Sequence, residues 1–466
     1  MRNMAERFVH SWSELAETEH SLDELKAWIH DRNRNTEVDI KKTYMNEDDF
    51  WYYDSAEGRI RNRNGSFFSI AGLKLFREEN EIFEQPIILQ NEIGYLGILC
   101  KEINGVLHFL MQAKIEPGNI NNVQISPTIQ ATRSNFTQKH GGRKPEFLDY
   151  FMDAEKHCII FDQIQSEQSS RFYCKRNRNI MVYLDENTEV PLTDNYRWMT
   201  LGQLKELMKE DNLVNMDTRT VISCIPYAMW TLEDEEKRTV YEMFNDKALF
   251  SSIFEKRGLN GMVPVYRYIN NRKMFNDTRT EIVPLDELGS WERTPEGVFC
   301  KEPADYKVIY CDIAIEGREV QRWKQPLFEA QGKAVFGLFT RISDDGRREF
   351  LVRGKEEIGC FDLMELGPAV QLEATFRTES LDCVERYFIE KYKKSSGVIK
   401  NVVLSEEGGR FYHEENRNII IEVGCDEISD IPEGYFWMDF YTLNLMTQIN
   451  NCLNIQLRNL LSLIDI

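Results

Sequence analysis

Short runs of alternating hydrophobic and polar residues fill the chain from about residue 50 to 190. Turn residues separate the runs, as in a β-rich segment, and clear examples are 66–70, 95–114, 156–165 and 179–184. Asn104-Gly105 stands between two strand-like runs, and this dipeptide favours a tight β-hairpin. A second hairpin is predicted to turn at 174–177, between runs at 169–173 and 179–184.

Hydrophobic residues at helical spacing mark the N-terminal segment 1–45, where Leu22, Leu25 and Trp28 follow Ser21, a residue suited to cap a helix. Residues 201–213 are also predicted to form an amphipathic helix. Strands with one or two packed helices indicate the α+β class, with a mixed sheet in each unit.

The chain contains an internal duplication. Residues 166–223 align with 405–462 at a constant offset of 239, with 17 of 58 pairs identical, and the match resumes upstream at offset 241. We also align Leu22–Trp28 with Leu285–Trp291 because both read LDELxxW. A period near 240 is too long for a solenoid, whose repeats span roughly 20–50 residues. We therefore predict a first unit at 1–225, a helical connector without a counterpart at 226–283, and a second unit at 284–466.

Composition excludes several classes of protein. The net charge of −20 argues against non-specific binding to nucleic acid or anionic membranes. No apolar run is long enough to span a membrane, and the first residues have no signal-peptide core. The ten cysteines form no CxxC pair and the seven histidines no HxxxH motif, which favours reduced thiols, a cytoplasmic protein and no metal site. GxGxxG and P-loop motifs are absent.

Residues 112–142 form an unusually polar segment. Residues 123–132 alternate like a strand, and a face of hydroxyl and amide groups without charge favours a sugar or another ligand, although so polar a segment could also be an exposed loop. The second unit retains Lys355, Glu357 and Gln371 but replaces 131–142 by an unrelated sequence. The first unit is therefore the better candidate for chemistry.

Shared polar residues elsewhere admit two interpretations each. Arg171 and Arg178 flank the second predicted hairpin and recur as Arg410 and Arg417, which suits either a solvated turn or a clamp for a carboxylate or diphosphate. A stripe shared by the two units would lie on one face of an unbroken helix and consists of Asn212, Asn215, Arg219 and Ser223. Its simpler explanation is helix capping and hydrogen bonding between the units.

Three stretches, 112–142, 162–179 and 198–224, resemble signature sequences of the NDP-hexose 2,3-dehydratases, and 317–327 and 405–418 resemble the second half of that family. The resemblance covers nearly the whole chain. It implies two Nudix-like units that lack the metal-binding Nudix box, a homodimer, no cofactor and no metal. It also implies a nucleotide-linked 4-keto-6-deoxyhexose as substrate, usually dTDP-linked, with a 3-ketoreductase as a possible downstream partner.

The implied reaction needs a base for the C3 proton, an acid for the departing C2 hydroxyl and a donor to the ketone. Lys114 could polarise the ketone, while Glu116, His140 and Tyr173 could move protons. The candidate substrate-binding residues are Asn119, Asn121, Gln124, Ser126, Thr128, Gln130, Thr132, Arg133, Ser134, Asn135, Arg171, Arg178, Asn179, Arg410 and Arg417. Alternatives are a non-catalytic nucleotide-sugar binding protein and a Nudix pyrophosphatase, although the latter would need the missing glutamate box.

Overall fold

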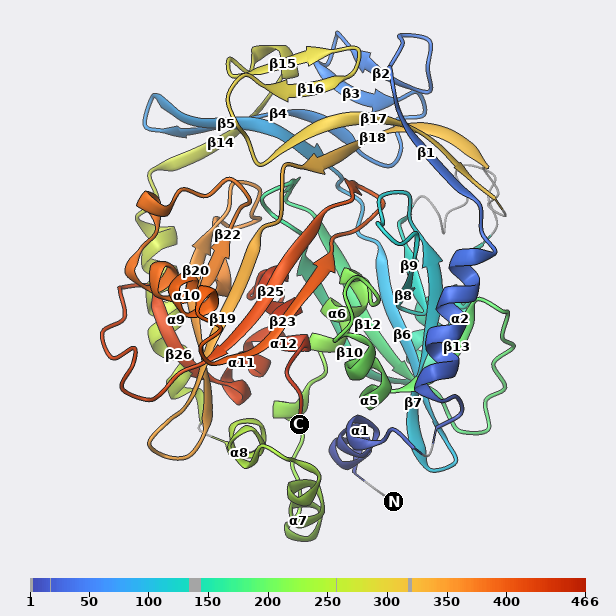
Figure 1. Cartoon of the computed structure of the whole chain (residues 1–466), viewed down its shortest axis with the longest axis vertical. Helices are drawn as coiled ribbons and strands as arrows, with labels where there is room; N and C mark the ends of the chain where they lie inside the picture. Colours follow the sequence, from blue (N-terminus) through green and yellow to red (C-terminus); the bar gives the residue numbers. More distant parts are fainter. Residues whose placement is uncertain (1–2, 17, 134–143, 257, 317–320) are drawn as a thin grey trace.

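The computed structural model describes residues 3–16, 18–133, 144–256, 258–316 and 321–466. Within these ranges the strands form four sheets, two of seven strands and two of six. The seven-stranded sheets lie next to each other in the lower part of Figure 1, with the six-stranded sheets above them. Helices α6 (Met216–Ser223) and α12 (Ile455–Ser462) pack against each other between the lower sheets.

We call the two duplicated units the first and second copy. The lower sheet of the first copy is mixed, because β12 runs parallel to β6 and antiparallel to β10. Its strands are β6 (Tyr95–Ile103), β7 (Val106–Ile115), β8 (Val123–Ser126), β9 (Ile129–Ala131), β10 (Cys158–Ser166), β12 (Arg176–Tyr183) and β13 (Tyr196–Thr200). Asn104 and Gly105 both have positive φ, 53° and 79°, in the turn between β6 and β7. This is the backbone that an Asn-Gly hairpin turn requires, and the prediction is confirmed.

The second copy repeats this sheet. Its strands are β19 (Val335–Ile342), β20 (Arg348–Glu356), β21 (Met364–Pro368), β22 (Val370–Leu372), β23 (Val398–Ser405), β25 (Glu415–Glu422) and β26 (Tyr435–Asp439). β25 again runs parallel to its neighbour β19.

The upper sheets exchange strands between the copies. β1 (Val38–Thr43) pairs with β17 (Tyr306–Ile315) of the second copy, and β14 (Thr278–Val283) pairs with β4 (Ser69–Arg77) of the first. The remaining upper strands are β2 (Trp51–Asp54), β3 (Arg59–Asn62), β5 (Asn80–Leu89), β11 (Phe172–Tyr173), β15 (Trp291–Thr294), β16 (Gly297–Cys300), β18 (Arg322–Ala330) and β24 (Phe411–Tyr412). Each upper sheet therefore depends on both copies.

Two loops, which we call the crossing loops, also link the copies: residues 167–175 between β10 and β12, and 406–414 between β23 and β25. The Gly118 N–H donates to the Gly408 carbonyl at 2.7 Å, and the Gly359 N–H donates to the Ser169 carbonyl at 2.9 Å. A Cβ at Gly118 would lie 1.5 Å from the carbonyl oxygen of Phe411, so this approach requires glycine. The second predicted hairpin is therefore wrong. Its first run, 169–173, lies in the crossing loop, where β11 pairs with β5 of an upper sheet, and β12 pairs with β10 instead.

Helices cover the lower sheets. Besides α6 and α12 they are α1 (Met4–Ser13), α2 (Leu22–Arg34), α4 (Leu148–Met152), α5 (Leu201–Leu207), α7 (Asp234–Met243), α8 (Lys247–Phe254), α9 (Met262–Met274), α10 (Cys383–Lys393) and α11 (Phe440–Thr447). Ser21 caps α2 as predicted, with its hydroxyl accepting the Glu24 N–H. The predicted helix 201–213 ends early, at Leu207.

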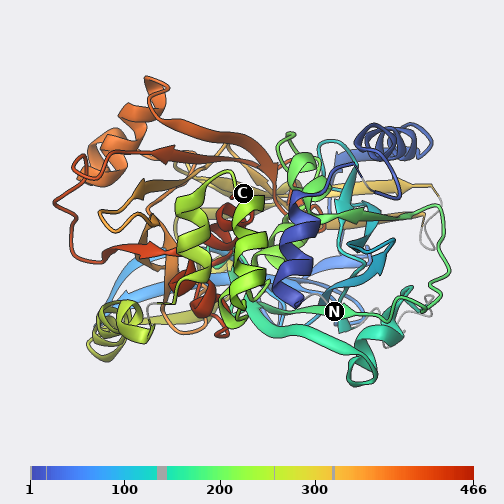
Figure 2. The same ribbon diagram turned by 90° about the horizontal axis from the view of Figure 1, so that it is seen from below.

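The second copy begins earlier than residue 284. Ser11 on α1 and Ser252 on α8 donate to strand carbonyls, and each accepts an N–H from the helix that follows the last strand of its sheet. α9 corresponds to α2, because α2 contacts β8 and α9 contacts β21, the matching strand of the second copy. Figure 2 shows these two helices at opposite ends of the molecule. The connector 226–283 therefore does contain counterparts of the N-terminal elements. The alignment of Leu22–Trp28 with Leu285–Trp291 was wrong, since Trp291 begins β15 as Trp51 begins β2.

The shared polar stripe is not one helix face, because Asn212 has φ 56° in the link between α5 and α6. Asn215 caps α6 by accepting the Thr218 N–H at 2.8 Å. Arg219 is fully buried and donates to the Ser405 carbonyl of the second copy at 2.7 Å, while Arg458 donates to the Ser166 carbonyl of the first. Capping and hydrogen bonding between the units, the simpler of the two explanations, is confirmed.

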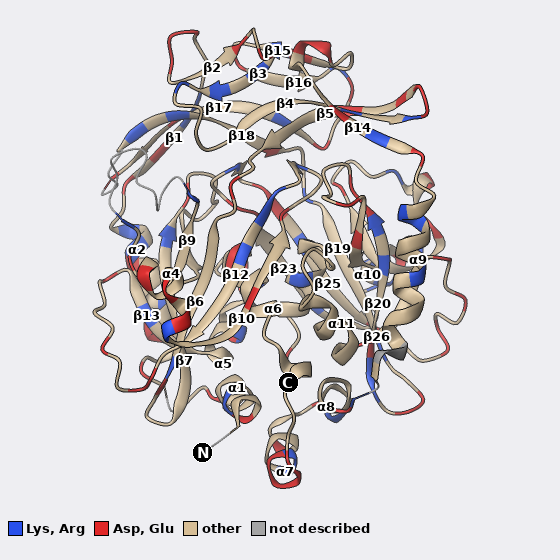
Figure 3. Ribbon diagram, turned by 180° about the vertical axis from the view of Figure 1, so that it is seen from behind, with Lys and Arg blue, Asp and Glu red and all other residues tan. Residues whose placement is uncertain are grey.

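The predicted class, with mixed sheets and two repeated halves, is confirmed at this level. Asp and Glu positions are spread over sheets, loops and helices, as Figure 3 shows. Among the described helices, none combines the length and apolar character needed to cross a membrane.

Candidate functional site

A cavity of about 980 Å³ lies where the copies meet. The first copy contributes residues of β6, β7 and β9, the start of α6 and aromatic residues around β2. The second copy contributes residues of β18 and of the crossing loop 406–414. Because both copies line it, neither copy could form this cavity alone.

Cationic side chains of the second copy line one part of the cavity. The Arg410 guanidinium lies over the Phe68 ring, 4.4 Å from its centroid, and donates to Gln90 Oε1 at 3.1 and 3.2 Å. Among the residues described, no carboxylate forms a salt bridge with Arg410. Lys324 and Arg322 also line the cavity and pair with Asp49 and Asp312 respectively. This arrangement suits an anionic ligand that brings its own oxygen acceptors.

Lys114, Glu116 and Gln130 form a network on the wall made by β7 and β9. Gln130 Nε2 donates to Glu116 Oε1 at 2.9 Å, and the Gly408 N–H donates to Glu116 Oε2 at 3.1 Å. Lys114 Nζ lies 3.4 Å from Glu116 Oε1. Both oxygens of Glu116 are therefore engaged, which fixes Lys114 and the crossing loop in position.

Three further carboxyl groups line the cavity: Glu146 before α4, Asp217 at the start of α6 and Glu407 in the crossing loop. Asp217 is only 3% exposed, and its side chain makes no hydrogen bond or salt bridge with the described residues. Burial raises its pKa well above the usual value, and Glu167 and Glu407 raise it further. Burial also raises the pKa of Glu407, although the Arg410 guanidinium opposes this shift.

Glu167 and Lys175 complete the buried charge cluster. Burial raises the pKa of Glu167 to about 7, and Glu167 accepts a hydrogen bond from Asn177 Nδ2 at 2.7 Å. Burial lowers the pKa of the Lys175 ammonium, which lines the cavity, to about 8. Lys175, Asp217 and Glu407 were missed by the sequence analysis, because each differs from its counterpart in the other copy and we followed shared residues.

Arg171, the counterpart of Arg410, has a different environment. It is 3% exposed, pairs with Glu373 at 2.9 Å and lies over the Tyr306 ring at 4.3 Å. Glu373 stands where the first copy has Thr132, so the second copy supplies an acid that neutralises this arginine. Arg171 therefore does not reach the cavity, whereas Arg410 does.

Six of the candidate residues line the cavity: Lys114, Glu116, Thr128, Gln130, Thr132 and Arg410. The expectation of one continuous ligand-facing strand was wrong, because β8 pairs with β7 while β9 crosses to β6. Gln124 consequently donates to Ser405 Oγ at 2.7 Å, and Ser126 donates to Gln130 Oε1 at 3.0 Å.

Other candidates lie away from the cavity. Tyr173 Oη lies 3.5 Å from Thr280 Oγ1 in an upper sheet, and Arg178 pairs with Asp162. Four more hydrogen-bond to nearby loops or strands: Asn119, Asn121, Asn179 and Arg417. Arg133 is exposed. His140, Ser134 and Asn135 lie outside the described residues.

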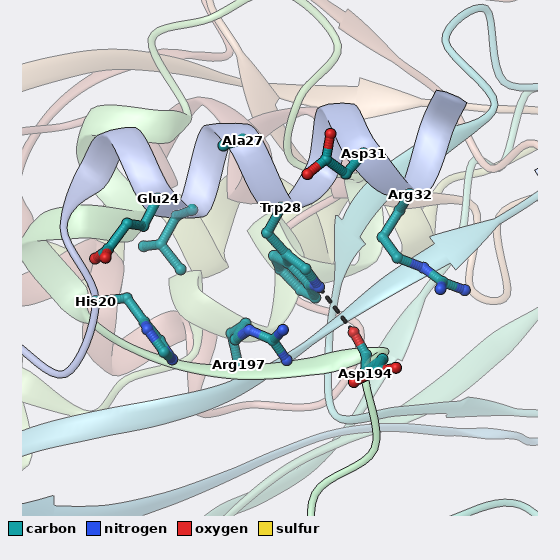
Figure 4. Close-up of a pocket in the computed structure, with 9 residues that line it drawn as sticks. His20, Glu24, Ala27, Trp28, Asp31, Arg32, Asp194 and Arg197 are labelled. Atoms are coloured by element: carbon teal, nitrogen blue, oxygen red, sulfur yellow. Dashed lines mark hydrogen bonds between the residues drawn. The ribbon is translucent and has the colours of Figure 1, made fainter. Parts of the chain in front are cut away.

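A smaller hollow of about 450 Å³ lies along α2 (Figure 4). Trp28 Nε1 donates to the Asp194 carbonyl at 2.8 Å, and the Arg197 guanidinium lies 5.4 Å from the Trp28 ring centroid. These contacts attach α2 to the segment before β13. In the residues described, no group of three or more His, Cys, Asp or Glu is placed to hold a metal ion.

Comparison with known proteins gives consistent matches. The family model described as NDP-hexose 2,3-dehydratase matches residues 22–225 and 262–464, which begin at the first residues of α2 and α9. Three relatives are each named dTDP-4-dehydro-6-deoxy-α-D-glucopyranose 2,3-dehydratase. The protein of Streptomyces violaceoruber is 36% identical, with 94% of this chain and 95% of the relative covered. That of Amycolatopsis orientalis is 34% identical (95% and 90%), and that of Saccharopolyspora spinosa is 34% identical (99% and 94%).

Proposed function

This chain belongs to the NDP-hexose 2,3-dehydratase family, and we propose that it removes water across C2 and C3 of a dTDP-linked 4-keto-6-deoxyhexose in the cavity between its copies. The reaction makes it a hydro-lyase of deoxysugar biosynthesis. The observation that carries the proposal is the joint cavity, which is lined by cationic groups in one part and by proton-transfer groups in another.

The cationic part suits the nucleotide diphosphate. Arg410 can form two parallel bonds to phosphate oxygens, since its guanidinium has no carboxylate partner in the described chain. Lys324 adds positive charge on the same side. The exposed aromatic ring of Phe50, which also lines the cavity, offers a face on which the base can stack.

The part near Lys114 suits the sugar. The C4 ketone acidifies the C3 proton, so a base can form an enolate and the C2 hydroxyl can leave once an acid protonates it. An ammonium donor at the ketone oxygen, the role we assign to Lys114, stabilises the enolate. Glu116 holds Lys114 in place rather than moving protons, because both of its oxygens are bonded. General acid and base each contribute roughly 10²–10⁴-fold to such a reaction.

The test is to incubate the protein with dTDP-4-keto-6-deoxyglucose and follow the sugar nucleotide by mass spectrometry, with the diketone product trapped by an aromatic 1,2-diamine. We expect the loss of one water per molecule. Binding of the nucleotide sugar without any change in mass would contradict catalysis and favour a non-catalytic binding protein.

Finer properties belong to the same proposal. We propose a cytoplasmic homodimer of chains that each contain two Nudix-like units, with a 3-ketoreductase consuming the reactive diketone. Exposed apolar side chains on and beside α9, those of Val263, Met274 and Phe275, offer a surface for a second copy. Sedimentation velocity of the wild type and of Phe275→Ser would test the dimer.

A further inference from the structure

The duplication supplies an internal control for the site. The network of Lys114, Glu116 and Gln130 recurs in the second copy, where Gln371 Nε2 donates to Glu357 Oε1 at 3.0 Å beside Lys355. Asn215 and Asn454 donate to the two glutamine side chains in the same way. A network present in both copies serves both. A carboxyl group present in only one of the two copies can instead serve chemistry that is confined to the first cavity.

Two carboxyl groups of the cavity meet this condition. Asp217 on α6 corresponds at offset 239 to Gln456 on α12, and Glu407 corresponds to Gln168. Because the crossing loops exchange places, Asp217 of the first copy and Glu407 of the second line the same cavity. At the related place in the other half, both carboxyl groups are replaced by amides, which keep a similar shape but cannot transfer a proton.

The two groups lie in different surroundings. Asp217 is 3% exposed and has no hydrogen-bond or ion-pair partner among the described side chains, and burial together with three neighbouring glutamates raises its pKa. Glu407 is half-buried. Burial and the Glu116 carboxylate raise its pKa, but three cations that face it, Arg410, Lys114 and Lys175, oppose this shift and favour its ionised form. Two carboxyl groups whose environments differ in this way suit an acid and a base.

On the basis of the proposed function, we propose that Asp217 is the acid and Glu407 the base of the elimination. The C3–H bond breaks and its proton passes to the Glu407 carboxylate, while the electron pair forms the enolate of the C4 ketone. The enolate then expels the C2 oxygen, which leaves as water with the proton of Asp217. The enol product loses its C3 hydroxyl proton and gains one at C2, so the sum is the loss of one water and no oxidant takes part.

The test uses a substrate whose C2 hydroxyl is replaced by fluorine, since fluoride leaves without needing a proton. Water loss from the normal substrate is measured by mass spectrometry and fluoride release from the analogue by fluorine NMR. The variants are Asp217→Asn and Glu407→Gln. Glu357→Gln is the matched control, because it makes the same carboxyl-to-amide change in the buried network of the second copy without lining the cavity. Calorimetric binding of dTDP verifies that each variant is folded, and Asp217→Ala replaces the first variant if it does not fold.

We expect Asp217→Asn to lower the rate of water loss at least about 100-fold and the rate of fluoride release less than about threefold. Glu407→Gln should lower the rates of both reactions about 100-fold, and Glu357→Gln should lower neither. Equal losses of both reactions in Asp217→Asn, or retention of either reaction in Glu407→Gln, would overturn the assignment. A wild-type protein that releases neither water nor fluoride would instead contradict the proposed function, and this inference with it.

Discussion

Replacement of Arg410 by lysine should weaken nucleotide binding while the turnover rate at saturation changes little. Arg410 lies over Phe68 and bonds to Gln90, and no carboxylate of the described residues forms a salt bridge with it. Lysine keeps the positive charge but cannot make two parallel bonds to one phosphate. The perturbation therefore removes one charge-assisted hydrogen bond and the stacking of a planar group.

The size of the effect follows from the bonds that are lost. A hydrogen bond to a charged group contributes about 1.5–3 kcal/mol. At about 1.4 kcal/mol per tenfold change, the loss of one such bond corresponds to roughly a 10- to 100-fold increase in the dissociation constant for dTDP. Since the diphosphate does not react, KM should rise by a similar factor while kcat stays within about twofold.

Isothermal titration with dTDP and steady-state kinetics measure both quantities. The matched control is Arg171→Lys, because Arg171 is buried against Glu373 and lies outside the cavity. It should leave the affinity for dTDP unchanged. The reasoning is refuted if Arg171→Lys weakens dTDP binding as much as Arg410→Lys, or if Arg410→Lys binds as tightly as the wild type.

Three further outcomes are expected. Lys114→Ala should lower kcat by at least about 100-fold and Lys355→Ala by less than about threefold, and equal losses in steady-state assays would show that the copies share catalysis. Gly118→Ala should lower the activity even at temperatures at which the variant is fully folded, because the added Cβ would collide with the crossing loop that carries Arg410. Full activity together with normal dTDP affinity would contradict that contact. Glu167 has a pKa of about 7 in the folded protein against an ordinary 4.5, so the unfolded chain loses its proton first and wild-type stability falls from about pH 4.5 to 7. Glu167→Gln removes this titrating carboxyl group. Calorimetry at several pH values should therefore show a smaller fall in the free energy of unfolding between pH 4.5 and 7 than in the wild type.

The sequence predicted those parts of the fold that depend on local or repeated patterns. The Asn104-Gly105 turn follows from two residues that tolerate positive φ, and the duplicated lower sheets follow from residues that each copy must retain for its core. Lys114 and Glu116 were found in the same way, because their network is retained in both copies.

Contacts between the copies could not be read from such patterns. A short strand such as β1 gives no sign that its partner is β17 of the other copy. The crossing loops resemble tight hairpins because their flanking strands do pair, although the residues between them reach the opposite half. Arg171 and Arg410 each begin the same tripeptide, Arg-Phe-Tyr, which does not show that Arg171 pairs with Glu373 whereas Arg410 bonds to Gln90.

The central claim is that one cavity, built jointly by the two copies, holds the nucleotide sugar. A crystal structure of the protein with bound dTDP tests it most directly. The account predicts the diphosphate within hydrogen-bond distance of the Arg410 guanidinium, in the cavity that Lys114 and Asp217 also line. A diphosphate bound to Arg171 in the second half, with the first cavity empty, would contradict the account.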